Sequence, residues 1–255
     1  MPVDTEELIS RLRSSKSTVV LTGAGVSAAS GIPTFRGEDG LWRQFRAEDL
    51  ATPEAFAMNP QLVWEWYDWR RTAVAAARPN AAHEVLARWS QRPGFALITQ
   101  NVDGLHERAG TRNLVRFHGS IWELRCAAGC GAAPWDNHDA PLAPLPPTCP
   151  ACSGIARPAC SGIARPGVVW FGENIDPDVL ERSSAAAARA DVFLSIGTSS
   201  LVYPAAGLLH HAKRNGAFTV EINPGATDIS RMVDLPIAAP AEDALSMLDA
   251  RVKMG

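Results

Sequence analysis

The chain of 255 residues lacks the features that would assign it to a membrane or to nucleic acid. It has no apolar run near the ~18 residues that a membrane-spanning helix needs. The segment from Met1 to Lys16 places Leu8, Ile9 and Leu12 at helical spacing among charges, without the apolar core of a signal peptide. Basic charge is also in deficit, because 24 Lys and Arg stand against 27 Asp and Glu, whereas nucleic-acid scaffolds are usually basic. We therefore expect a cytoplasmic protein that binds neither membranes nor nucleic acid.

Cysteine is scarce, with five residues in the chain, and four of these form two close pairs. Cys126 and Cys130 make the first pair, and Cys149 and Cys152 follow after eighteen intervening residues. In a reducing compartment this pattern binds metal more often than it forms disulfides, and two thiolate knuckles suit a tetrahedral zinc ion. Four sulfur ligands leave no position for water, so we expect one structural zinc ion. The alternative is a set of reduced cysteines that only pack.

The fifth cysteine lies in a short tandem repeat. Residues 151–158 (ACSGIARP) recur without change at 159–166, and such a unit is too short for a solenoid. The repeat indicates a recent tandem insertion or an error in the sequence. We expect the extra eight residues to form a loop before Val168. Cys160 follows Pro-Ala just as Cys152 does and could replace it as a ligand, but Cys152 makes the more compact knuckle.

Short apolar segments alternate with helical segments along much of the chain. The expected strands are residues 18–21, 95–99, 192–196, 218–222 and 235–238, and the expected helices are 81–89, 177–190 and 205–215. This alternation predicts an α/β fold, in which helices cover both faces of a Rossmann-like parallel sheet. Cofactors bind beyond the carboxyl ends of such strands, where we expect Gly23, Gln100, Gly197 and Asn223 to gather.

Two insertions interrupt the alternation. Residues 37–80 are rich in tryptophan and helical in pattern. Residues 123–166 hold the cysteines and six prolines between Pro134 and Pro150, a density that excludes regular helix or central strand. We expect the insertions to form a smaller domain, one part helical and the other a zinc ribbon. The Rossmann-like domain would then contain residues 1–36, 81–122 and 167–255, with the active cleft between the two domains.

A glycine-rich turn follows the first expected strand. Residues 23–28 (GAGVSA) fit the G-x-G-x-x-[GA] pattern that binds the pyrophosphate of dinucleotides. Gly23 would permit a tight turn, Gly25 would let the backbone approach the phosphates, and the small Ala28 would let the next helix pack on the sheet. The motif alone is weak, but the tail at residues 30–36 (SGIPTFR) is too specific for a generic dehydrogenase turn.

With this tail, four further segments resemble the sirtuins, a family of NAD-dependent protein lysine deacylases. They are residues 99–106 (TQNVDGLH), 117–120 (FHGS), 168–173 (VVWFGE) and 197–199 (GTS), in the order found in the family. The resemblance runs from about Val19 to Ala241, and it departs from the family at Ala29 and near Gly225, where glutamate is usual. It implies that the protein uses NAD to remove acyl groups from lysine in proteins. The products would be nicotinamide, deacylated lysine and O-acyl-ADP-ribose.

The resemblance also implies roles for individual residues. His118 would act as general base on the ribose hydroxyls, which suits an imidazole with a reference pKa of ~6.5. Asn101 and Asp103 would hold the nicotinamide carboxamide, and Gln100 would contact the ribose. The other implied NAD contacts are Gly23, Ala24, Gly25, Ala28, Phe35, Arg36, Trp42, Gly197, Thr198, Ser199, Asn223 and Ala241.

Residues 64–70 (WEWYDWR), preceded by Ala51, resemble the class III branch of the family, which removes succinyl and malonyl groups. Tyr67 and Arg70 are spaced i, i+3, so on a helix they share a face and could grip a carboxylate. Ala51 would leave room for a longer acyl chain. The alternative is a helix interface in which Trp64, Tyr67 and Arg70 only pack.

The substrate backbone would add as a strand between an expected strand at residues 168–173 and residues 200–203. The implied contacts are Val168, Val169, Phe171, Gly172 and Glu173. We expect a monomer that acts on acylated-lysine protein substrates.

Three other functions remain as alternatives. Mono-ADP-ribosyl transfer cleaves the same NAD with another acceptor, and the masses of the products would separate it from deacylation. A zinc-ribbon module that senses NAD without turnover would not need Asn101, Asp103 and His118 together. A dehydrogenase is disfavoured because nothing here resembles a substrate site for hydride transfer.

Overall fold

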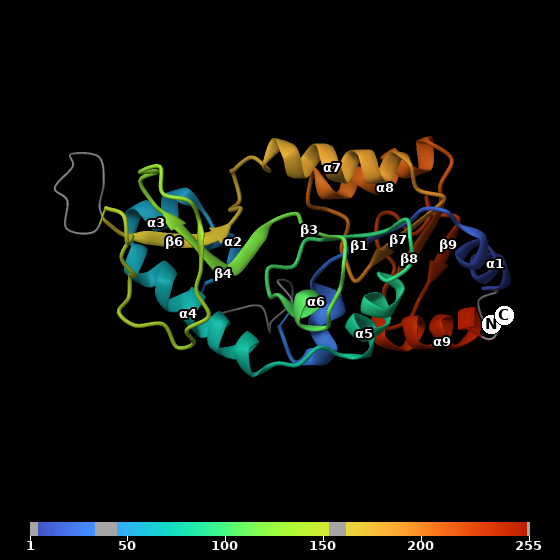
Figure 1. Ribbon diagram of the computed structural model, residues 1–255, viewed down its shortest axis with the longest axis horizontal. Helices are drawn as coiled ribbons and strands as arrows, with labels where there is room; N and C mark the ends of the chain where they lie inside the picture. The colour runs from blue at the N-terminus through green and yellow to red at the C-terminus, as the bar shows by residue number, and fades with distance from the viewer. Residues whose placement is uncertain (1–4, 34–44, 153–161, 254–255) are drawn as a thin grey trace.

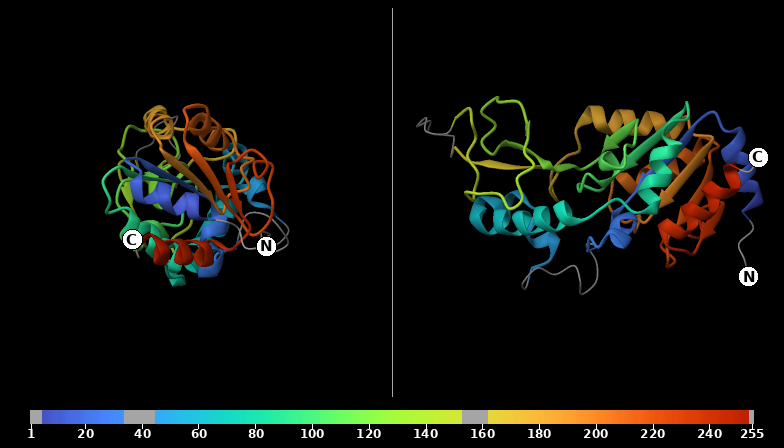
Figure 2. Two further views of the ribbon diagram at one scale, coloured as in Figure 1. Left: turned by 90° about the vertical axis from the view of Figure 1, so that its right-hand side faces the viewer. Right: turned by 60° about the horizontal axis from the view of Figure 1, so that its bottom comes forward.

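The computed structural model describes residues 5–33, 45–152 and 162–253. Figure 1 shows an elongated molecule with a large sheet toward one end and a small sheet toward the other. The first and last helices, α1 (Glu6–Ser14) and α9 (Ala241–Lys253), lie side by side at the large-sheet end in both views of Figure 2. Among the described helices, none is long and apolar enough to cross a membrane.

The large sheet is parallel, with six strands in the order β3-β2-β1-β7-β8-β9. They are β1 (Thr18–Thr22), β2 (Phe95–Thr99), β3 (Leu114–Arg116), β7 (Val192–Ile196), β8 (Phe218–Ile222) and β9 (Leu235–Ile237). Thr22 pairs with both Thr99 and Ile196, so the carboxyl ends of the three central strands are level. Every residue of β1 and β7 is buried, as in strands that are covered on both faces.

Helices cover both faces of this sheet, which confirms the expected α/β architecture. One core contains residues of α1, α5 (Ala81–Trp89) and α9, packed on Val20 of β1. The opposite core contains residues of α7 (Pro177–Ala188) and α8 (Ala205–Arg214), packed on Val19 and Leu21. Successive residues of β1 thus face opposite layers, as strand geometry requires.

The helix expected after β1 is η1 (Ala24–Ser30), a 3-10 helix. The packing role expected of Ala28 is wrong, because its side chain is exposed while Val26 and Ser27 are buried. The other expected elements of the large sheet occur nearly as predicted, and the two later helices end at Ala188 and Arg214, slightly before their expected ends.

The small sheet has three antiparallel strands in the order β5-β4-β6. They are β4 (Gly119–Cys126), β5 (Trp135–Asp136) and β6 (Ala164–Val168). Beside them lie α2 (Ala47–Leu50), α3 (Pro53–Met58) and α4 (Pro60–Ala76), while the short α6 (Leu105–Arg108) follows β2. Trp64 and Tyr67 of α4 share one core with Ile121 and Leu124 of β4. The helical insertion therefore packs on the strands of the small sheet. The residue limits expected for the two domains remain a prediction.

The strand expected over residues 168–173 is wrong beyond its first residue. β6 ends at Val168, and the chain then folds into a turn in which the Glu173 N–H donates to the Trp170 carbonyl at 3.0 Å. The Glu173 carboxylate in return accepts the Trp170 N–H at 2.9 Å. Gly172 has a φ of +85° there, a backbone conformation that glycine adopts readily. These contacts replace the hydrogen bonds that a continued strand would make.

The two copies of the repeat take different places. Cys152, from the first copy, lies in the cysteine cluster, whereas Ala164 and Arg165, from the second copy, lie in β6. The Cys149 N–H donates to the Gly162 carbonyl at 2.8 Å. The second copy of the repeat therefore continues beside the second cysteine pair, Cys149 and Cys152. Residues 153–161, which include Cys160, lie outside the described residues. The chain on either side of them is therefore already held together.

Deletion of residues 153–160 would leave a single copy of ACSGIARP and the same flanking contacts. We expect this variant to retain its zinc and to gain free energy of unfolding on the order of 1 kcal/mol, because a shorter loop costs less entropy to close. Metal analysis and thermal unfolding of both proteins would measure the two effects. A variant that loses zinc or melts at a lower temperature would contradict this view of the insertion.

Candidate active site

A cavity of about 600 Å³ lies beyond the carboxyl ends of β1, β2, β7 and β8 and reaches the turn after β6. This volume is in the range of cofactor and small-molecule sites. Most of the expected site residues line it, namely Gly23, Ala24, Gly25, Ala51, Tyr67, Arg70, Gln100, Asn101, His118, Val168, Val169, Phe171, Gly172, Glu173, Gly197, Thr198, Ser199 and Asn223. The ends of β1, β2, β7 and β8 therefore bring Gly23, Gln100, Gly197 and Asn223 together, as the sequence predicts.

Three of the expected site residues that the structure describes do not line this cavity. Ala28 is on the exposed side of η1, and Ala241 is buried in the core under α9. Asp103 is buried behind the glycine-rich loop. Phe35, Arg36 and Trp42 lie outside the described residues.

The glycine-rich loop contacts the turn after β7 backbone to backbone. The Gly25 N–H donates to the Gly197 carbonyl at 2.8 Å. A Cβ atom on Gly25 would lie 2.8 Å from the Gly197 Cα, and one on Gly23 would lie 2.8 Å from the Thr198 Cβ. Gly23 itself is extended, with φ −127° and ψ −172°, and its carbonyl accepts the Val26 N–H at 3.1 Å, which closes the tight turn that the sequence predicts. Glycine is needed here because two chain segments approach closely.

A buried hydrogen-bond network supports Asn101 from behind. The Asn101 side-chain amide donates to the Gly23 carbonyl at 3.1 Å and to Ser27 Oγ at 3.2 Å. Ser27 Oγ in turn donates to Asp103 Oδ2 at 2.7 Å. Burial raises the pKa of Asp103, although hydrogen bonds from Leu105 and Ser27 oppose this. Ser27 was not among the expected site residues, and its place inside the glycine motif is the signal that could have found it.

His118 joins the large sheet to the small one. Its Nδ1 lies 3.1 Å from the Gln100 carbonyl, which can only accept, so Nδ1 carries the proton and Nε2 keeps its lone pair. Burial lowers the pKa of His118, although the bond to Gln100 opposes this, and the imidazole is neutral near pH 7. Gly119 follows with a φ of +78°, and a Cβ there would lie 2.0 Å from the Gly167 carbonyl oxygen. The chain can turn into β4 directly after the imidazole only because this residue is glycine.

Two other buried histidines lie deeper in the same region. His106 Nε2 is 3.0 Å from Thr22 Oγ1, and its ring centroid is 4.8 Å from that of His83. Burial lowers the pKa of His83 to about 4 and that of His106 well below its usual value. Among the described residues that line the cavity, His118 is the only histidine. The geometry therefore offers one imidazole as a base.

Tyr67 and Arg70 meet the cavity beside Ala51, as their i, i+3 spacing on α4 predicts. The Tyr67 hydroxyl accepts a hydrogen bond from Trp170 Nε1 at 2.9 Å. Burial raises the pKa of Tyr67 to about 12, so the phenol stays protonated at physiological pH. Burial also lowers the pKa of Arg70, and Tyr67 and Asp103 oppose this shift. A protonated phenol thus lies one helical turn from a guanidinium on one wall.

Glu173 was expected to contact the substrate, but its carboxylate is bound within the protein. Arg165 donates to it through Nη1 at 2.5 Å and through Nη2 at 2.8 Å. Burial raises the pKa of Glu173, but the hydrogen bonds from Arg165 and Trp170 outweigh this and hold it below its usual value. Arg165 was not expected here, because the repeat hid which of its two copies enters the sheet.

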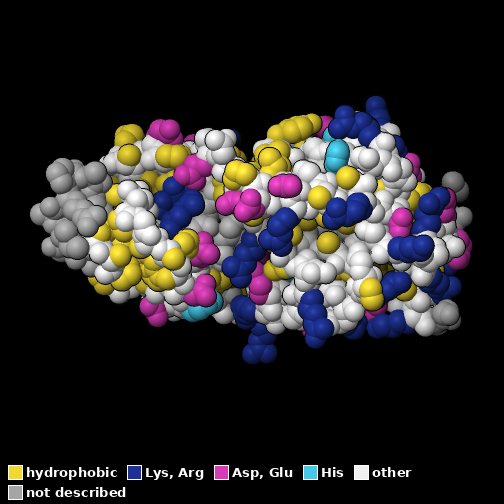
Figure 3. Space-filling model, turned by 45° about the horizontal axis from the view of Figure 1, so that its top comes forward, with side chains coloured by type: hydrophobic (Ala, Val, Ile, Leu, Met, Phe, Trp, Pro, Cys, Tyr) yellow, Lys and Arg dark blue, Asp and Glu magenta, His cyan; other side chains and the backbone are white. Residues whose placement is uncertain are grey.

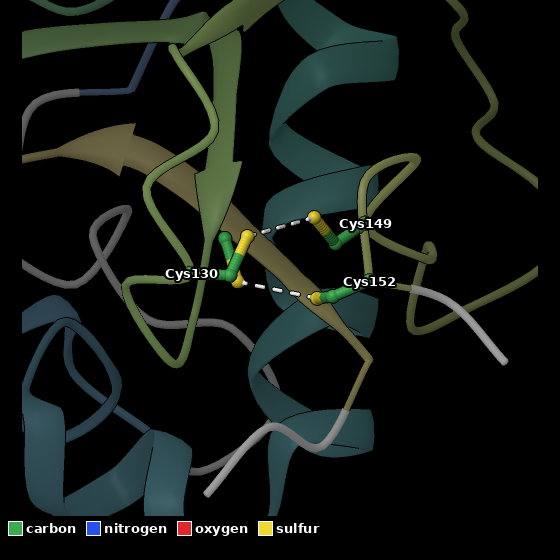
Figure 4. Close-up of side chains that lie close together, drawn as sticks. Cys130, Cys149 and Cys152 are labelled. Atoms are coloured by element: carbon green, nitrogen blue, oxygen red, sulfur yellow. Dashed lines mark hydrogen bonds between the residues drawn. The ribbon is translucent and has the colours of Figure 1, made fainter. Parts of the chain in front are cut away.

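The four expected cysteines converge beside the small sheet. Their sulfur atoms all lie within 4.8 Å of one another, with 3.7 Å from Cys126 to Cys152 and 3.8 Å from Cys130 to Cys149. Figure 4 shows Cys130 on the segment after β4, facing Cys149 and Cys152 on the opposite loop. A tetrahedral ion with Zn–S bonds of about 2.3 Å separates its sulfurs by about 3.8 Å. The cluster therefore fits a structural zinc ion.

Charged side chains of both signs lie together on the face of the molecule that Figure 3 draws. Figure 3 shows Lys and Arg side chains mixed with Asp and Glu side chains on the face drawn there. A macromolecular substrate would meet the shape of the cavity rather than a field of one sign on this face.

Comparison with known proteins identifies the family. The model of the Sir2 family matches residues 23–204. The NAD-dependent protein deacylase of Aquifex aeolicus (strain VF5) is 50% identical over 228 residues, which is 89% of this chain and 91% of that protein. The NAD-dependent protein deacylase 1 of Archaeoglobus fulgidus is 45% identical over 250 residues, which is 97% of this chain and 98% of that protein.

Solved structures show the same likeness. A Sir2 homologue in complex with NAD has a TM-score of 0.89 and 44% identity, covering 98% of this chain and 94% of that chain. A structure of Sir2 with a p53 peptide and NAD has a TM-score of 0.82 and 27% identity, covering 99% and 100%. From the family match and these likenesses, the chain belongs to the Sir2 family, the sirtuins.

Proposed function

We propose that this sirtuin removes succinyl and malonyl groups, and also acetyl groups, from lysine residues of proteins, with NAD as co-substrate. The general reaction is supported by the relatives named NAD-dependent protein deacylase and by the Sir2 structures that hold NAD or a p53 peptide. The preference for acidic acyl groups is carried by one observation, the presence of Tyr67 and Arg70 on the cavity wall beside Ala51. A guanidinium and a phenol can bind a carboxylate through charge-assisted hydrogen bonds.

The cavity offers residues for the phosphates, the riboses and the nicotinamide of NAD. Ala24, Gly25, Thr198 and Ser199 would hold the phosphates, where the two backbone turns meet. Gln100 and Asn223 would contact the riboses, and Asn101 would bind the nicotinamide carboxamide. Asp103 would support Asn101 through their shared hydrogen-bond partner Ser27. Phe35, Arg36 and Trp42 remain proposed contacts on the same cofactor. When bound, NAD supplies an activated ribose carbon, and the acyl group ends on ADP-ribose as nicotinamide leaves.

His118 is the general base of this proposal. The Gln100 carbonyl holds the proton on Nδ1, so Nε2 is free to take a proton from a ribose hydroxyl. Burial keeps the imidazole neutral and removes competing water, which increases the effect of its position.

The peptide would bind along residues 168–173, with Val168, Val169, Phe171 and Gly172 as contacts. The Val169 and Phe171 N–H groups already donate to the carbonyls of His118 and Ala51, at 3.0 and 2.9 Å. The substrate backbone would therefore meet this segment mainly at its carbonyl groups. Main-chain recognition of this kind tolerates many sequences.

Replacement of His118 by alanine should lower turnover by about 10²-fold to 10⁴-fold, the usual contribution of a general base. Affinity for NAD should change little, because Nε2 acts only on the reacting hydroxyl. Since burial lowers the pKa of His118, the imidazole stays neutral as the pH falls past ~6.5, and the acid limb of wild-type kcat/KM should lie below that value. Assays of nicotinamide release between pH 5 and 8 would measure turnover and the acid limb, and calorimetry would measure the affinity for NAD. His211→Ala on α8 is the control. An undiminished His118→Ala enzyme would refute the assignment.

Replacement of Arg70 by methionine removes the cation and keeps the length of the side chain. We expect kcat/KM for a succinyl-lysine peptide to fall about tenfold to 150-fold, as a lost hydrogen bond to a charged group predicts, while the value for the acetyl peptide changes little. Steady-state assays with matched peptides would show the difference. Arg108→Met, which removes a guanidinium bound to the Val74 carbonyl away from the cavity, is the matched control. Equal losses for both peptides would show that Arg70 does not read the acyl carboxylate.

A further inference from the structure

The Tyr67 hydroxyl has a fixed donor on one side. Trp170 Nε1 lies 2.9 Å from its oxygen, and the two side chains belong to residues that are only 3% and 2% exposed. An indole N–H can donate but cannot accept, so the phenol oxygen is the acceptor in this bond. The proton of the phenol must therefore point to a different acceptor. Both residues line the cavity, which is where such an acceptor can enter.

The orientation of the indole is fixed by contacts on its ring and on its backbone. The Arg165 guanidinium lies 3.4 Å over the Trp170 ring. The Phe56 ring also packs on it, with centroids 5.1 Å apart and planes inclined at 42°. Glu173 binds both Arg165 and the Trp170 N–H, at 2.8 and 2.9 Å from the same carboxylate oxygen. These contacts hold the indole N–H where it donates to Tyr67.

We propose that Trp170 is a positioning residue for acyl specificity, which orients the Tyr67 hydroxyl so that its proton is offered to the carboxylate of an acidic acyl group. This inference rests on the proposed preference for succinyl and malonyl groups. A carboxylate only accepts hydrogen bonds, so a phenol whose oxygen is already occupied presents the one group that the ligand can use. The chain from indole to phenol to carboxylate also aligns its dipoles, which strengthens each bond. An acetyl group ends in a methyl group, which cannot accept a hydrogen bond at the position of that carboxylate.

The test is Trp170→Phe, which keeps an aromatic ring under Arg165 and removes the indole N–H. We expect the ratio of kcat/KM for succinyl over acetyl peptide to fall about fivefold, as the loss of one ordinary hydrogen bond predicts, with the change in KM rather than kcat. In a Tyr67→Phe background the same substitution should leave the ratio nearly unchanged, because the hydroxyl that it orients is gone. Trp89→Phe is the matched control, since it removes a buried indole bond to Asp249 far from the cavity and should leave the ratio as it is.

The NMR resonance of the Trp170 indole N–H gives a readout that does not depend on activity. It is assigned by its loss in Trp170→Phe, and it should shift in Tyr67→Phe. Succinyl peptide with NAD analogue should shift it further than acetyl peptide with the same analogue does. If Tyr67→Phe does not move it, or if Trp170→Phe lowers the ratio equally in both backgrounds, the positioning role is wrong. A wild-type protein without any succinyl preference would instead refute the acyl preference itself. A ratio of succinyl to acetyl kcat/KM that is unchanged in Trp170→Phe would refute only the role of Trp170.

Discussion

The rest of the site depends on the close contact between the turns that follow β1 and β7. The Gly23 N–H donates to the Ile196 carbonyl at 3.0 Å, and a Cβ on Gly197 would lie 2.5 Å from the Val26 nitrogen. Two backbones this close exclude side chains, so glycine is required on both sides. The contact brings the end of β1 against Thr198, which also receives a hydrogen bond from Gln100 at 3.0 Å. Three strand ends thereby form one continuous wall.

The second constraint is the place where the chain leaves the large sheet. β4 begins at Gly119, directly after His118, and Gly119 pairs with Val168 of β6. The imidazole therefore lies between the wall proposed to bind NAD and the wall formed by α4 and the turn after β6. This explains why one cavity contains both the residues proposed for NAD and the residues proposed for the acyl group. The zinc cluster lies outside this cavity and is expected to hold the small sheet together.

Much of the fold could be predicted from the sequence, because its strands are short apolar runs bounded by polar or glycine-rich turns. β1, β2, β7 and β8 are of this kind, and each leads into a predicted site residue. The errors arose where long-range contacts decide local structure. The sequence predicts that Ala28 packs the next helix on the sheet, whereas its side chain on η1 is exposed. Residues 169–173 read as a strand until the bonds among Arg165, Trp170 and Glu173 are known.

In the part of the site proposed to bind the acyl group, long-range contacts likewise could not be predicted from the sequence. The spacing of Tyr67 and Arg70 was visible in the sequence, since both lie on one helix. The donor to Tyr67 was not, because Trp170 is 103 residues away and no local pattern joins the two. The repeat was visible, and the structure confirms the predicted Cys152 of the first copy as a member of the cysteine cluster. The place of Arg165, from the second copy, in β6 is seen only in the structure.

In the proposed reaction, residues of one cavity cleave NAD and transfer an acidic acyl group from lysine. The most direct test is to incubate the zinc-loaded protein with NAD and matched succinyl-, malonyl- and acetyl-lysine peptides, and to identify the products by mass spectrometry. The account predicts nicotinamide, deacylated peptide and O-acyl-ADP-ribose in equal amounts, formed faster from the succinyl and malonyl peptides. Consumption of NAD with ADP-ribose attached to protein, or no consumption of NAD with any peptide, would contradict it.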